Sequence, residues 1–176
     1  PEAVRQARVL GLPVKQGRFR EAALTGGSYD LLTMWDYIEH VEDPMEDLKE
    51  AARALKPGGL LALSTPDAGS WAARLLGRRW LGYCSPREHL TYFTEATLSR
   101  MLRAAGLDPI LSTHAGKDLY VSRVVTRLRV VSVPLSRLAG AVARALSLER
   151  RRVYLNPLDT LLVVARKMAY SVRPPG

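Results

Sequence analysis

Two short apolar runs flank an amphipathic stretch in the first third of the chain. The runs cover residues 29–35 and 60–64, and the second is nearly continuous, as is typical of a strand covered on both faces. Between them, apolar residues recur at helical spacing, namely Leu48, Ala51, Ala52 and Leu55. The pattern predicts a strand, a helix and a second strand, joined by a right-handed crossover into a parallel sheet.

The ends of this helix are marked in the sequence. Asp43 suits the N-cap, Pro44 suits the first helical position, and Glu46 completes the spacing of a capping box. The run Pro57-Gly58-Gly59 then stops the helix before the second strand. We therefore expect a helix between residues 43 and 55.

Weaker patterns predict the remaining elements. Apolar spacing indicates helices at 1–10, 70–76 and 94–105, and strands at 14–16, 109–113 and 158–165. Residues 67–93 form a long connection rich in aromatic side chains, which is typical of a lid or a binding loop. Residues 119–148 keep helical spacing, with a break at Pro134.

The net charge of +9 is concentrated late in the chain. Residues 1–116 are neutral overall, with 14 basic and 14 acidic side chains, whereas residues 117–152 hold 9 basic and 2 acidic ones. A basic stretch this local makes nucleic acid an unlikely partner for the whole domain, although salt-sensitive nucleic-acid binding remains a third interpretation. The segment 119–152 is either an insertion that caps a substrate pocket, which we favour, or a peripheral contact with an anionic membrane.

Length and cysteine content set further bounds. The 176 residues suit one domain, and the single cysteine, Cys84, excludes an internal disulfide and fits a reducing cytoplasm. No apolar run reaches the length of a membrane span, and no signal peptide is visible. We expect a cytoplasmic protein.

The candidate chemistry follows the first strand. Ligands of parallel sheets bind beyond the carboxyl ends of the strands, where Asp36, Glu39 and His40 stand. Residues three and four apart share a helical face, so this trio could hold a divalent cation such as Mg²⁺. In the alternative, Glu39 binds backbone amides and His40 is a structural histidine.

The ordered set of motifs resembles class I S-adenosylmethionine (SAM)-dependent methyltransferases, in the branch of the ubiquinone-biosynthesis O-methyltransferases. The matching pieces are Tyr29-Asp30, Glu39-His40-Val41, Asp43-Pro44, Leu55-Lys56-Pro57-Gly58-Gly59, Ser64-Thr65-Pro66, Pro86-Arg87-Glu88-His89-Leu90, Tyr92-Phe93-Thr94 and Asn156-Pro157-Leu158-Asp159-Thr160-Leu161. The resemblance implies an α/β, Rossmann-like methyltransferase fold with a mostly parallel sheet and an antiparallel last strand. It also places that last strand between those at 60–64 and 109–113.

The family begins with a strand and a glycine-rich turn, then a second strand ending in an acid, and neither is present here. Pro1-Glu2-Ala3-Val4 resembles the start of the helix after that acid. We therefore expect residues 1–176 to form a single incomplete domain that lacks the first two strands, with a basic helical insertion at about 117–152. A fragment with unpaired strands is expected to be unstable, inactive or impaired, and unable to bind the cofactor measurably.

The resemblance also assigns roles to residues. Gly17, Arg18 and Phe19 match the segment that meets the adenine of SAM, although Arg18 stands where many relatives have an acid. Trp35 matches a position that touches the methionine part, with a core aromatic as the equal alternative. A similar acidic trio in the ubiquinone relatives is associated with metal dependence.

The acceptor side is assigned more loosely. His40 or His89 could act as a general base, the alternative being catalysis by positioning alone. Asp36, Arg87 and Tyr92 are candidates for substrate contacts, although Arg87 could simply pair with a nearby glutamate, and His114 is expected at the surface.

These inferences predict methyl transfer from SAM to an oxygen, or less favourably a nitrogen, of a small-molecule, quinone-like or glycan substrate. The alternative is a non-catalytic binding or scaffold module of the same fold.

Overall fold

The computed structural model describes residues 2–83 and 89–169. Its α-helices are α1 (Glu2–Val9), α2 (Pro44–Ala54), α3 (Trp71–Leu76), α4 (Glu95–Ala104), α5 (Val121–Leu128) and α6 (Val133–Ala145). Its strands are β1 (Tyr29–Trp35), β2 (Leu55–Pro66), β3 (Leu107–His114), β4 (Lys117–Tyr120), β5 (Arg152–Leu155) and β6 (Thr160–Lys167).

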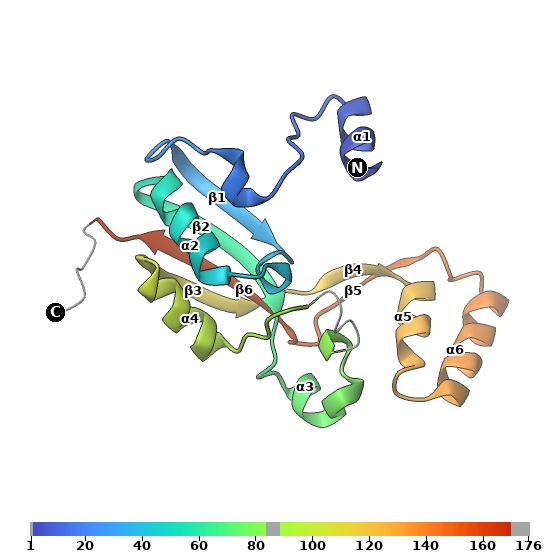
Figure 1. Ribbon diagram of the computed structural model, residues 1–176. Coiled ribbons are helices and arrows are strands. Elements are labelled where there is room, and N and C mark those ends of the chain that lie inside the picture. Colours follow the sequence, from blue (N-terminus) through green and yellow to red (C-terminus); the bar gives the residue numbers. More distant parts are fainter. Residues whose placement is uncertain (1, 84–88, 170–176) are drawn as a thin grey trace.

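A four-stranded sheet in the order β1-β2-β6-β3 forms the body of the protein (Figure 1). β1 pairs in parallel with β2, and β6 runs antiparallel to both of its neighbours, β2 and β3. β1, β2 and β3 therefore share one direction, and only the last strand opposes them. This confirms the mostly parallel α/β sheet with an antiparallel last strand.

Helices α2 and α4 cover one face of this sheet (Figure 1). Leu48 of α2 and Leu98 of α4 are fully buried, and both belong to the core with Leu61 and Leu63 of β2 and Val163 of β6. On β1, Met34 is buried while Leu31 and Trp35 are exposed by about half, at 54% and 55%. Alternate residues of a strand point to opposite faces, so the other face of β1 is left open.

The predicted strand–helix–strand unit is confirmed, with α2 starting after an N-cap at Asp43, whose side chain accepts from Glu46 N. β2 begins at Leu55, earlier than expected, because the glycines bring the chain against β1. A Cβ on Gly59 would lie 3.1 Å from the carbonyl oxygen of Tyr29 and 3.0 Å from that of Lys56. Gly58 has a φ of +78°, which favours glycine. Only glycine lets β2 lie this close to β1 without a shift of the neighbouring backbone.

The strand expected at 14–16 is wrong: these residues form no strand. A single extended segment gains a strand's hydrogen bonds only beside a ladder partner, and no described strand lies along it. The 3-10 turn Phe19–Ala22 follows instead. Two short strands were not predicted at all, β4 and β5, which pair antiparallel and leave the main sheet as a ribbon.

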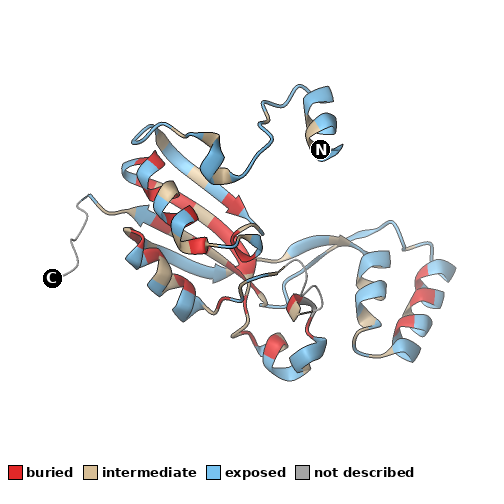
Figure 2. Cartoon of the chain, viewed as in Figure 1, coloured by how far each residue is buried: buried red, intermediate tan, exposed pale blue. Residues whose placement is uncertain are grey.

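This ribbon carries a helical hairpin, α5 and α6, away from the sheet (Figure 1). The two helices pack through small side chains, since Ser136 Oγ donates to the carbonyl of Val125 and Gly140 lies against the Val125 side chain. Pro134 stands in the first turn of α6, so the predicted break separates two helices. Figure 2 shows that most of the hairpin surface is exposed.

Candidate functional site

A cavity of about 600 Å³ opens beyond the carboxyl ends of β1 and β2, between the main sheet, α3 and the hairpin. Its polar lining includes Asp36, Glu39, His40, His89, Lys117, Arg127 and Asp159. Its apolar lining includes Leu76 of α3, Leu119 of β4 and Val124 and Leu128 of α5. The basic segment 119–152 therefore supplies one wall of the cavity.

Asp36 directly follows β1 in a left-handed conformation, with a φ of +46° that is uncommon for a residue other than glycine. Ser64 Oγ, at the matching end of β2, donates to Asp36 Oδ1 at 3.0 Å. Lys117 Nζ of β4 lies 2.7 Å from Asp36 Oδ2. Burial alone would raise the pKa of Asp36, but the hydrogen bond and charge of Lys117, with help from Ser64 and His40, lower it below its ordinary value. Asp36 is thus held as a carboxylate.

Glu39 lies in the short turn Ile38–His40 and is almost completely buried, at 2% exposure. Its backbone carbonyl, not its carboxylate, accepts hydrogen bonds from the amides of Leu90 and Thr91. Its Oε1 lies 3.9 Å from His40 Nε2, and within the described residues no donor reaches its Oε2. A buried carboxylate oxygen without a donor is costly, which makes Glu39 a functional candidate.

His89 stands beside His40, with 4.8 Å between the two ring centroids. Its Nδ1 lies 2.8 Å from the carbonyl oxygen of Gly82. A carbonyl oxygen can only accept, so Nδ1 carries the proton and Nε2 of the neutral ring keeps its lone pair. The predicted residues His40 and His89 are therefore brought together, and the backbone fixes the tautomer of His89.

The predicted metal trio is only partly assembled. The side chains whose ligand atoms lie within 4.8 Å of one another are Glu39, His40 and His89, so Asp36, which is engaged by Lys117 and Ser64, is not part of the group. Mg²⁺ prefers an octahedron of oxygen ligands, whereas two imidazoles and one carboxylate suit zinc or another transition metal. The donor set does not fit the expected Mg²⁺.

The other predicted residues lie outside the cavity lining. Trp35 is half-exposed, and Phe19 packs edge-on against Tyr37 at 6.3 Å between ring centroids. Gly17 and Arg18 directly precede Phe19, whose ring partner Tyr37 follows the end of β1 by two residues. Tyr92 stacks edge-on with Tyr83 and reaches the His89 ring. The predicted residue Arg87 lies outside the described residues.

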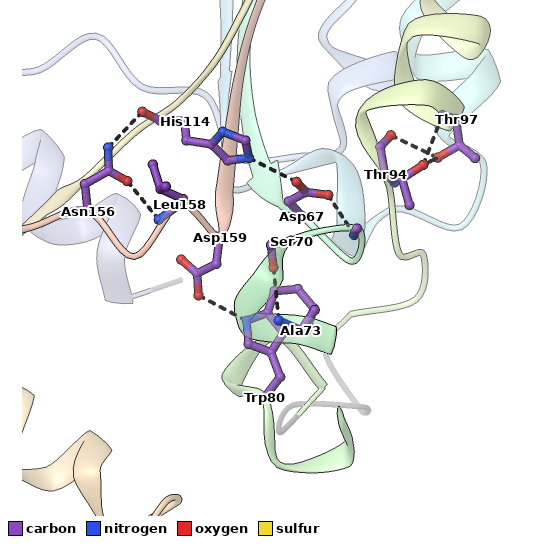
Figure 3. A network of polar contacts seen from close by, with 11 residues as sticks. Asp67, Ser70, Ala73, Trp80, Thr94, Thr97, His114, Asn156, Leu158 and Asp159 are labelled. Carbon is purple, nitrogen blue, oxygen red and sulfur yellow. Dashed lines mark hydrogen bonds and ion pairs between the residues drawn. The ribbon is translucent and has the colours of Figure 1, made fainter. Parts of the chain in front are cut away.

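Sequence reasoning missed a polar network on the other side of the cavity (Figure 3). The buried Trp80 donates from Nε1 to Asp159 Oδ2 at 3.0 Å, and His114 Nε2 lies 3.0 Å from Oδ2 of the buried Asp67. His114 was expected at the surface but is half-buried and paired with Asp67, because β2 and β3 run in the same direction on either side of β6 and their carboxyl ends meet at one end of the sheet. The sequence held a signal for this pair. Asp67 directly follows β2 and His114 ends β3, and the carboxyl ends of strands that run in the same direction lie at one end of the sheet.

No helix in the described part of the chain has the length and apolar character needed to cross a membrane.

Comparisons with known proteins agree with this geometry. A family model described as a methyltransferase domain matches residues 5–112. A ubiquinone biosynthesis O-methyltransferase of Xanthomonas oryzae is 34% identical over 119 residues, covering 61% of this chain and 50% of that protein. One of Cereibacter sphaeroides is 31% identical over 117 residues, covering 62% of this chain and 47% of that protein. The chain thus spans about half the length of these relatives.

Solved structures share the fold at low identity. A SAM-dependent methyltransferase from Thermotoga maritima superposes with a TM-score of 0.58 at 21% identity, covering 92% of this chain and 67% of that one. A geranyl diphosphate methyltransferase in complex with SAM gives a TM-score of 0.55 at 14% identity, covering 93% of this chain and 62% of that one. Identities this low support the fold alone.

Proposed function

This chain belongs to the methyltransferase domain family, and we propose that its protein transfers a methyl group from SAM to a hydroxyl oxygen of a small molecule. The observation that carries the proposal is His89. The Gly82 carbonyl fixes its tautomer so that Nε2 carries the lone pair that can accept a proton, and its ring lines the cavity.

The chemistry asked of the chain is modest. When bound, SAM supplies an electrophilic methyl group on a sulfonium, which needs orientation more than activation. His89 Nε2 accepts the proton of the acceptor hydroxyl as the oxygen–methyl bond forms and the methyl–sulfur bond breaks. His40, 4.8 Å away, is the alternative base. Gly17, Arg18, Phe19 and Trp35 are our candidates for contacts with the cofactor.

The acceptor is an amphipathic molecule in this proposal. One end of the cavity carries Asp36, Glu39 and the two histidines, whereas the hairpin side offers aliphatic side chains such as Leu119 and Val124. An aliphatic wall favours a quinone-like phenol over a glycan, because a sugar would leave its hydroxyls facing groups that cannot hydrogen-bond. The names of the matched relatives point to the same acceptor class.

The proposal is tested with the full-length gene product. Methyl incorporation from radiolabelled SAM is measured with an alkyl-substituted catechol, the same catechol without its alkyl group, and a monosaccharide. We expect transfer to the catechols, with the higher kcat/KM for the alkylated one. Tight SAM binding without transfer to any acceptor would instead favour a non-catalytic module of the same fold. The 176-residue chain, assayed alongside, is expected to show little or no transfer.

A further inference from the structure

A second groove lies between α5 and α6, on the hairpin and separate from the cavity described above. Its volume is about 380 Å³, and its lining includes the guanidinium-bearing side chains of Arg129, Arg137 and Arg144. Arg129 caps the end of α5, while Arg137 and Arg144 stand seven residues apart on α6. Two turns of helix separate residues seven apart, so these two arginines lie on the same side of α6.

The close packing of the hairpin shapes this groove. A Cβ on Gly140 would lie 3.3 Å from Val125 Cγ1 and 3.6 Å from Nη1 of Arg144. The absence of a side chain at Gly140 therefore lets the helices approach and lets the Arg144 guanidinium fold over the helix into the groove. The Ser136 hydroxyl already donates its proton to the Val125 carbonyl, so it does not donate to a ligand in the groove.

The three arginines have no counter-charge in the part of the chain that the structure describes. Among the described residues, no carboxylate forms an ion pair with Arg129, Arg137 or Arg144. The hairpin segment 117–152 contains only Asp118 and Glu149 as acids, and neither lines the groove. Three like charges that share one groove repel one another unless an anion neutralises them.

The arginines and the exposed apolar residues of α6 lie on different sides of this helix. Leu135, Leu138, Val142 and Leu146 form an exposed apolar stripe along α6. Arg137 follows Leu135 by two residues, or roughly 200° around the helix. The stripe and the arginines therefore face different sides of α6, and one flat membrane would not contact both.

We propose that this groove binds a phosphate-bearing anion through Arg129, Arg137 and Arg144. A phosphoryl group offers several charged oxygens in different directions, which suits guanidinium groups from two helices, whereas a single carboxylate is satisfied by one arginine fork. The ligand is a soluble phosphate ester or the phosphate headgroup of a lipid, which share this chemistry. The site is independent of the methyl-transfer proposal.

Calorimetry of the full-length gene product with inorganic diphosphate tests the site. The double variant Arg137→Gln/Arg144→Gln is expected to bind at least about tenfold more weakly, since the loss of even one charge-assisted hydrogen bond costs about that factor. The matched control, Arg74→Gln/Arg100→Gln, removes two exposed arginines outside the hairpin and should bind as the unaltered chain does. Equal weakening by both pairs, or no saturable heat with the unaltered chain, overturns the proposal.

A second measurement needs no variant. Inorganic diphosphate should slow the modification of Arg137 and Arg144 by phenylglyoxal, read by mass spectrometry, and leave Arg100 unprotected. Protection of all three, or of none, contradicts the site.

Vesicles distinguish the two sources of phosphate. Sedimentation with phosphatidic acid in phosphatidylcholine should be reduced by the groove variant, and not by Leu138→Ser, if a lipid headgroup is the ligand. Diphosphate binding without vesicle binding identifies a soluble ester. Vesicle binding that depends on Leu138 but not on the arginines would show an apolar lipid contact in place of the proposed site.

Discussion

Lys117 Nζ lies 2.7 Å from Asp36 Oδ2, although 81 positions separate the two residues in the sequence. Asp36 directly follows the first strand of the main sheet, and Lys117 begins the ribbon that leads to the helical hairpin. The ion pair therefore connects the hairpin to the polar end of the cavity.

Removing the lysine should change the titration of its partner. In Lys117→Met we expect the pKa of Asp36 to rise, because burial then acts without the opposing charge. The side-chain carboxyl shift in carbon-detected NMR measures it, with Lys117→Arg as the charge-conserving control. An unchanged pKa in the methionine variant would show that Ser64 alone holds the carboxylate.

The same pair gives a pH dependence of stability. The pKa of Asp36 is lower in the folded protein than in the unfolded chain, so its contribution is complete above the unfolded pKa of about 3.9. The contribution is lost as the pH falls through the folded pKa. Urea unfolding between neutral and acidic pH should therefore show a smaller acid-induced loss of stability in Lys117→Met than in Lys117→Arg. Identical pH profiles of stability in the two variants would contradict this prediction.

His89→Gln tests the proposed base in the full-length gene product. We expect kcat to fall by about 10²- to 10⁴-fold, the range typical of general-base catalysis, with a much smaller change in KM. Raising the pH should partly restore the rate, because the acceptor then ionises without help. If His40→Gln shows this behaviour and His89→Gln does not, the base is His40.

Trp80→Phe tests the network behind the cavity. Trp80 is 2% exposed and donates to Asp159, so its loss should lower the free energy of unfolding by about 1–3 kcal/mol. Trp71, which is 80% exposed, provides a matched control. Trp71→Phe should change the free energy of unfolding by no more than about 0.5 kcal/mol. Urea denaturation followed by circular dichroism measures both. A Trp80 variant as stable as the control would mean that Asp159 finds another donor.

Metal titration tests the corrected ligand group. We expect no saturable calorimetric signal with Mg²⁺, because Asp36 is engaged elsewhere and two imidazoles are poor ligands for it. The same calorimetric titration is run with Zn²⁺ for comparison, on the unaltered protein and on the Glu39→Gln variant. Stoichiometric Mg²⁺ binding that disappears in Asp36→Asn would restore the trio predicted from the sequence.

The sequence by itself determined the strand–helix–strand unit, because its signals are local. Asp43, Pro44 and the Lys-Pro-Gly-Gly run act on their own backbone, and apolar spacing of the helix needs no distant partner. The same local signals placed Glu39 and His40 at the carboxyl end of β1. The motif order supplied the position of the antiparallel strand β6 between β2 and β3.

Only the tertiary structure decided which side chains meet. Asp36 and Lys117, His40 and His89, and Trp80 and Asp159 are each brought together by strands and loops that no periodicity relates. It also decided that residues 14–16 form no strand, since a strand depends on a partner rather than on its own composition. Local physics fixed the elements, and the pairing of distant segments fixed the site.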